Sequence, residues 1–268
     1  MDKIQNIFAS CAAADRAALV IFCSCGYPDM DSSEQIIDDA IAAGADIIEL
    51  GVPFSDPMAD GAAIRQASEV ALREGATLKA VLAMAERLSK RHPDTGFILF
   101  SYMNVMFNYG LSTLCGELRR IGVDGILAVD LPYEERAELA GPCRAAGLHL
   151  IPLVSPMTSL ERAAMIMGEA TGFVYSVNVC GITGVREHLS PEVAERLAAL
   201  KEQSPVPVAA GFGIADAASA KAIARVADGV VVGSAVISKL LAPGELTARR
   251  YAAAELVRTL AGSMSRHA

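Results

Sequence analysis

The stretch that decides the fold is Ala43-Gly44-Ala45-Asp46-Ile47-Ile48-Glu49-Leu50-Gly51. It reads as the end of a helix, a turn at a glycine, and then a short apolar strand. A similar pattern returns as Ile-Gly-Val-Asp-Gly at 121–125 and as Val-Ala-Asp-Gly at 226–229. Such repeats of helix end, turn and strand start are typical of the connections in a parallel α/β protein.

Short apolar runs continue this rhythm along the chain, and each is bounded by Gly, Pro, Asp or Asn. Their lengths fit strands that are buried on both faces of a parallel sheet. We expect eight strands, at 18–23, 46–51, 96–102, 125–129, 149–154, 172–177, 206–210 and 229–233. Helical stretches follow at 32–43, 63–74, 78–90, 111–121, 134–146, 159–170, 190–203, 216–226 and 247–261. The pattern predicts one α/β domain over residues 1–268, a (β/α)8 TIM barrel with an extra N-terminal helix.

The composition argues against several classes of function. A formal net charge of −8 disfavours binding to nucleic acid or to anionic membranes. The sequence has neither an apolar run of membrane-spanning length nor the apolar core of a signal peptide, so we expect a cytoplasmic protein. The six cysteines read as buried small side chains rather than as a disulfide framework. The four histidines give no indication of a metal site.

Two acidic residues are candidates for acid–base chemistry, because barrel active sites lie at the C-terminal ends of the strands. Glu49 lies near the end of the second predicted strand, where partial burial would raise its pKa towards neutrality. Asp60 follows on a loop stiffened by prolines and glycines. The alternatives are a Glu49 paired with a cation at the barrel rim and an Asp60-Gly61 that only forms a turn. Tyr175 ends the sixth predicted strand. Its side chain would be either a hydroxyl group in the site or an aromatic ring at the rim of the barrel.

Glycines at two neighbouring strand ends predict a phosphate site. Gly211 and Gly213 follow the seventh strand, and Gly233 and Ser234 follow the eighth. Barrels commonly bind phosphate there through backbone N–H groups, which glycine allows the anion to approach closely. The run 181–184, Gly-Ile-Thr-Gly, follows the sixth strand and would add a further wall or a lid.

In their order, these motifs resemble the tryptophan synthase alpha subunit family from Phe22 to Ile237. The most specific stretch is residues 48–61, and further matches lie at 130–135, 172–175, 181–184, 211–214 and 228–235. The resemblance implies a lyase of tryptophan biosynthesis that cleaves indole-3-glycerol phosphate by a retro-aldol reaction to indole and glyceraldehyde 3-phosphate. The chain departs from the family pattern directly after the stretch 48–61. The family often has Pro and then Gln after the Asp-Gly pair, whereas this chain has Ala62 there and Arg65 three residues later.

The resemblance also implies residue roles. Glu49 would be the acid and base, Asp60 would hold the indole N–H, and Tyr175 would assist near Glu49. Gly184, Gly213, Gly233 and Ser234 would hold the phosphate, with Thr183 on a closing lid.

A partner follows from the same resemblance: a beta subunit in an alpha2-beta2 heterotetramer, which meets Asp56, Asn104, Asn108 and Pro132. We expect no cofactor on this chain, because pyridoxal phosphate belongs to the beta partner. A stand-alone lyase that releases free indole would have nearly the same sequence and stays open. A non-catalytic barrel subunit is disfavoured, because the carboxylates and the glycines are all present.

Overall fold

The strands form one parallel sheet that curls into a near-closed barrel. The structure, a computed structural model, describes residues 2–177, 189–211 and 213–266. Within these residues the strands are β1 (Ala18–Ser24), β2 (Ile47–Gly51), β3 (Gly96–Ser101), β4 (Gly125–Ala128), β5 (His149–Leu150), β6 (Leu153–Val154), β7 (Val174–Val177), β8 (Val208–Gly211) and β9 (Gly229–Val232). Their order is β5-β4-β3-β2-β1-β9-β8-β7-β6, which confirms the predicted barrel.

The predicted fifth strand is divided in two. β5 pairs with β4 and β6 pairs with β7, while Ile151 and Pro152 lie between the two halves. Pro152 has no backbone N–H to give to a strand ladder, so the regular pairing stops there. Because β5 and β6 end the strand order, the ring of strands closes through this segment.

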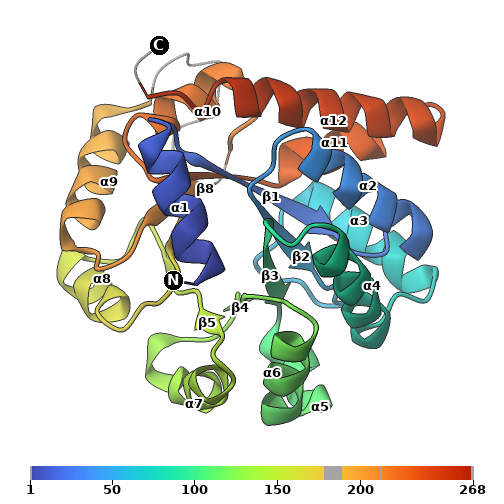
Figure 1. Cartoon of the computed structure of the whole chain (residues 1–268), viewed down its shortest axis with the longest axis horizontal. Coiled ribbons are helices and arrows are strands. Elements are labelled where there is room, and N and C mark those ends of the chain that lie inside the picture. Colours follow the sequence, from blue (N-terminus) through green and yellow to red (C-terminus); the bar gives the residue numbers. More distant parts are fainter. Residues whose placement is uncertain (1, 178–188, 212, 267–268) are drawn as a thin grey trace.

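The helices surround the strands (Figure 1). They are α1 (Lys3–Ala13), α2 (Met30–Ala42), α3 (Ala62–Arg73), α4 (Leu78–Arg91), α5 (Met103–Tyr109), α6 (Leu111–Arg120), the short helix η1 (Tyr133–Glu135), α7 (Ala137–Ala146), α8 (Leu160–Met167), α9 (Pro191–Gln203), α10 (Ala217–Ala224), α11 (Ser234–Leu241) and α12 (Leu246–Gly262). The extra N-terminal helix is confirmed. Two helices, α5 and α11, were not predicted. None of the described helices is long and apolar enough to cross a membrane.

The repeated aspartates explain how the strands start in register. Each accepts a hydrogen bond from a backbone N–H near the start of an adjacent strand: Asp46 from Leu19, Asp124 from Phe97 and Asp228 from Val208, at 2.8–3.0 Å. Each also has a cationic partner, which lowers the cost of burying its charge: Arg16, Lys3 and Lys201 respectively. The preceding Gly44 and Gly122 have φ of +112° and +84°, which favours glycine. These repeats are therefore structural, as predicted.

Helix α1 closes the N-terminal end of the barrel. Its buried residues Ile4, Phe8 and Cys11 join the core inside the strands. The ring of Phe8 lies 5.6 Å from that of Phe173. Figure 1 shows α1 lying across the strands. With this end filled by apolar side chains, the opposite, C-terminal end of the strands is left for a site.

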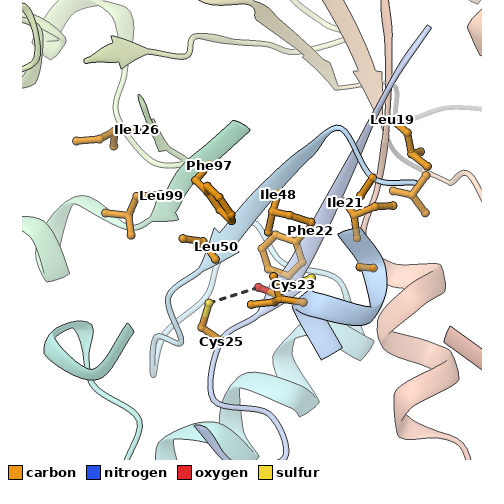
Figure 2. Packing of buried hydrophobic residues seen from close by; sticks show 14 of the residues in the cluster. Leu19, Ile21, Phe22, Cys23, Cys25, Ile48, Leu50, Phe97, Leu99 and Ile126 are labelled. Atoms are coloured by element: carbon orange, nitrogen blue, oxygen red, sulfur yellow. Dashed lines mark hydrogen bonds between the residues drawn. The ribbon is translucent and has the colours of Figure 1, made fainter. Parts of the chain in front are cut away.

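A second core lies between the strands and the surrounding helices. Alternate residues of β1, β2 and β3 face this layer, and Figure 2 shows Leu19, Ile21, Ile48, Leu50 and Phe97 packed together there. Because successive strand residues point to opposite faces, Glu49, which lies between Ile48 and Leu50, points into the barrel.

Candidate active site

Glu49 is a buried carboxyl group that forms no ion pair within the part of the chain that the structure describes. It lies in β2, in register with Phe22 of β1 and Ile98 of β3, and its side chain is 1% exposed. Its Oε1 atom has no hydrogen-bond partner within the described part of the chain. Burial raises the pKa of Glu49 from 4.5 to about 8. The carboxyl group is therefore mostly protonated at neutral pH and can both give and take a proton.

Asp60 lies at the end of the loop that follows β2, and Tyr102, the residue directly after β3, holds this loop. The N–H of Ala59 donates to the Tyr102 hydroxyl over 3.1 Å, and the Phe54 ring stacks on the Tyr102 ring with centroids 4.8 Å apart. Burial raises the pKa of Asp60, and a hydrogen bond from Tyr102 and the charge of Arg65 act against that rise. Asp60 is thus held in place by neighbours that favour its ionised form.

Tyr175 points into the barrel from β7 and lies near Glu49. Burial raises the pKa of its phenol far above 10, and the negative charge of Glu49 raises it further. Gly211 of β8 provides the space for this side chain, since a Cβ atom there would lie 2.5 Å from the Tyr175 hydroxyl. The structure therefore gives a packing reason for Gly211, which is the last residue of β8.

The other predicted phosphate residues lie at the C-terminal ends of β8 and β9. Gly211 pairs with Val231, so Gly213 and Gly233 each lie two residues beyond a paired position. Gly233 is the N-cap of α11, Ser234 is its first residue and is exposed, and no side chain among the described residues caps this helix. Its first N–H groups can therefore meet an anion. A Cβ atom on Gly61 would lie 3.5 Å from the Ser234 hydroxyl, so the end of the Asp60 loop lies beside this turn.

An aromatic wall lies among these groups and was not predicted as part of the site. Phe22 meets Phe100 edge-on, with ring centroids 4.9 Å apart. A Cβ atom on Gly51 would lie 2.3 Å from the Phe22 ring, and one on Gly233 would lie 3.2 Å from the Phe22 Cβ. The absence of side chains at these two glycines lets Phe22 cover the space between the Glu49 strand and the α11 turn.

The residues predicted to meet a partner are all exposed. Asp56 lies in the loop after β2, Asn104 and Asn108 lie on α5, and Pro132 precedes η1. Exposed apolar side chains accompany them, because Met58 is 96% and Phe107 49% exposed. The predicted lid residue Thr183 and the phosphate residue Gly184 lie outside the described residues.

The arrangement defines a class of protein: a barrel enzyme with a buried, proton-exchanging carboxyl group, a second carboxylate and an anion-binding turn at the C-terminal ends of its strands. In the described part of the chain, no group of three or more His, Cys, Asp and Glu side chains is placed to hold a metal ion.

Comparison with known proteins then gives the family. Residues 8–266 match the family model described as tryptophan synthase alpha chain. The chain therefore belongs to the tryptophan synthase alpha family, whose members are indole-3-glycerol-phosphate lyases.

Solved structures agree with this assignment over the full length. Tryptophan synthase subunit alpha from Legionella pneumophila str. Paris is 31% identical, with a TM-score of 0.90 and 98% of each chain covered. A chain of tryptophan synthase from Mycobacterium tuberculosis is 34% identical, with a TM-score of 0.88 and the same coverage. A chain from Aquifex aeolicus VF5 is 34% identical, with a TM-score of 0.89, covering 98% of this chain and 99% of that one.

Proposed function

We propose that this chain cleaves indole-3-glycerol phosphate to indole and glyceraldehyde 3-phosphate as the alpha subunit of a cytoplasmic tryptophan synthase. The observation that carries the proposal is the buried state of Glu49, which has a pKa of about 8 and no ion-pair partner among the described residues to fix its charge. Carbon–carbon cleavage at this substrate needs a proton at the ring carbon and a base at the side-chain hydroxyl. A carboxyl group poised near neutrality is able to supply both.

Glu49 would carry out both proton transfers in sequence. Its protonated form gives the proton to C3 of the indole ring, which leaves a positive charge shared with the ring nitrogen. The resulting Glu49 carboxylate takes the proton of the adjacent side-chain hydroxyl. The C–C bond then breaks, its electron pair returns to the ring, and the oxygen becomes the aldehyde carbonyl of glyceraldehyde 3-phosphate. Glu49 ends the cycle protonated, as it began.

Asp60 would stabilise the charge that appears on the ring. As a carboxylate it would accept the indole N–H and oppose the positive charge of the intermediate. Tyr102 and Arg65 favour its ionised form at neutral pH. Tyr175 stays a protonated phenol beside Glu49 and would orient it and the substrate hydroxyl.

The turn around α11 would hold the other end of the substrate. The phosphate would meet the free N–H groups at the start of α11, the Ser234 hydroxyl and the backbone at Gly213 and Gly233. We extend the site to Gly184 and to a lid at Thr183 on the family resemblance alone. Phe22 and Phe100 would pack against the apolar indole between the two ends.

We further propose that a beta subunit docks on the C-terminal face of the barrel, giving an alpha2-beta2 assembly. Asp56, Asn104, Asn108 and Pro132 are exposed there together with Met58 and Phe107. Exposed apolar side chains within a polar surface are typical of an interaction site. A matched chain comes from a structure of M. tuberculosis tryptophan synthase. The alternative is a stand-alone lyase that releases free indole.

One assay tests the reaction and the partnership. Glyceraldehyde 3-phosphate release from indole-3-glycerol phosphate is measured with and without the beta subunit from the same organism. Slow release by the isolated chain and fast release with the partner are expected. Fast release by the isolated chain alone would favour the stand-alone lyase, and no release in either case would refute the substrate.

A further inference from the structure

We propose that Cys115 and Cys143 form an oxidative modification site, in which a peroxide converts the two thiols into a disulfide that links α6 to α7. The two Sγ atoms lie 3.9 Å apart, and both side chains are buried. A disulfide bond is about 2.05 Å long, so each sulfur needs to move by only about 1 Å. The pair lies on the outer helices and is separate from the residues of the proposed active site.

A cavity brings a small oxidant to the Cys143 side of this pair, where the Cys115 sulfur lies 3.9 Å behind that of Cys143. It has a volume of about 410 Å³, lies between α7 and α8 against β5, and Cys143 is among its lining residues. The rest of its wall is mainly apolar, with Ala140, Leu148, Leu150 and Ile166. A water molecule takes up about 30 Å³ in the liquid, so the cavity has ample space for a peroxide of similar size.

Helix α7 has two features that allow the small movement. Pro142 lies inside the helix, directly before Cys143, and cannot donate the backbone hydrogen bond that holds an ordinary turn. The helix also starts at Arg136 without a side-chain cap. A helix interrupted in this way shifts or bends more readily than a continuous one.

The two thiols also differ in reactivity. A hydrogen bond from Cys143 lowers the pKa of Cys115, although burial opposes this, while the same contact raises the pKa of Cys143. At Cys11 and Cys23, burial instead raises the pKa to about 11 and about 12. Since the thiolate is the reactive form, Cys115 is the best nucleophile among the described cysteines.

The reaction balances with hydrogen peroxide as the oxidant. The Cys115 thiolate attacks one peroxide oxygen, the O–O bond breaks, and hydroxide leaves as Cys115 becomes a sulfenic acid. The Cys143 sulfur then attacks the Cys115 sulfur and displaces the oxygen that Cys115 received from the peroxide. This oxygen leaves as water after taking the proton of the Cys143 thiol. The two thiols lose two electrons, the peroxide gains them, and both peroxide oxygens end as water.

Peptide mapping of the full-length folded protein tests the proposal. The protein is treated with hydrogen peroxide, free thiols are alkylated after denaturation, and tryptic peptides are analysed without reduction. Trypsin places Cys115 in peptide 92–119 and Cys143 in peptide 137–144. We expect these two peptides to be linked, to separate after dithiothreitol, and free Cys115 to fall by at least about ten-fold relative to Cys11.

Two variants complete the test. Cys11→Ala removes another buried cysteine and should leave the linked peptide unchanged. Cys143→Ala should abolish the link and leave Cys115 as a sulfenic acid that dimedone traps, with circular dichroism checking that the variant is folded. If wild-type protein stays folded in peroxide and both thiols remain alkylatable, or if either cysteine links to a different one, the proposal is wrong.

Discussion

Replacing Glu49 by glutamine should stabilise the protein, and the gain should depend on pH in a calculable way. Burial raises the pKa of Glu49 from 4.5 to about 8 in the folded state. Between these two pH values the unfolded chain binds fewer protons than the folded one, so the stability of the wild type falls as pH rises. The amide of the Glu49→Gln variant has no proton to lose, so the variant lacks this loss of stability.

The size of the effect follows from the two pKa values. Each pH unit between 4.5 and about 8 should cost the wild type about 1.4 kcal/mol relative to Glu49→Gln. The difference in unfolding free energy should therefore grow by about 3 kcal/mol between pH 4.5 and pH 7, and by about 4 kcal/mol in total once the pH exceeds 8. Any change in packing or hydrogen bonding caused by the amide is independent of pH and cancels in this comparison.

Urea unfolding followed by circular dichroism measures this difference at pH values from about 5 to about 8. Glu34→Gln is the matched control. Burial raises the pKa of Glu34, but hydrogen bonds from Arg87 and Arg91 outweigh it and lower the pKa overall. Glu34 is therefore ionised in both states over this range, and its variant should differ from wild type by a constant amount. A Glu49→Gln difference that is equally constant would refute the buried, protonated carboxyl group.

Three further changes test the surroundings of the site. Gly211→Ala should destabilise the protein by about 1–3 kcal/mol in urea unfolding, because its Cβ would lie 2.5 Å from the Tyr175 hydroxyl; if adding Tyr175→Phe restores none of this loss, the clash is not the cause. Tyr102→Phe should raise the pKa of Asp60 and move the acidic limb of the pH–rate profile upward, since Tyr102 now lowers that pKa; an unmoved limb would contradict this. Lys3→Met should cost about 1–3 kcal/mol, because it leaves a largely buried aspartate unpaired; calorimetry showing an unchanged melting temperature would argue against this contribution.

The barrel itself could be predicted because its signals are local. Each strand is a short apolar run, and two of the connections repeat a glycine followed two residues later by an aspartate. Gly44 and Gly122 adopt positive φ, and Asp46 and Asp124 each hold a strand N–H, so the repeated letters correspond to repeated backbone geometry. Glu49 could be placed at the strand end for the same reason. Alternation along β2 requires it to face inward.

The short helices α5 and α11 could not be predicted in the same way. Both start at strand ends, at Tyr102 and Gly233, without a side-chain cap that would mark a helix in the sequence. The division of the fifth strand had a signal in Pro152, although the length of the apolar run concealed it.

The contacts around the carboxylates arise between strands and had no local signal. Phe22 covers Gly51 and Gly233 from neighbouring strands, and Tyr175 occupies the space above Gly211. Only the strand register places these residues together. A large inward residue beside a glycine on the adjacent strand is the pattern that would have identified them.

The most direct test of the account is the rate at which Glu49→Gln releases glyceraldehyde 3-phosphate from indole-3-glycerol phosphate, measured with saturating substrate and beta subunit. The account predicts a loss of at least about 10²–10⁴-fold relative to wild type, while the variant stays folded and still binds a phosphate-bearing substrate analogue. A rate within a few-fold of wild type would contradict the assignment of Glu49 as the acid and base.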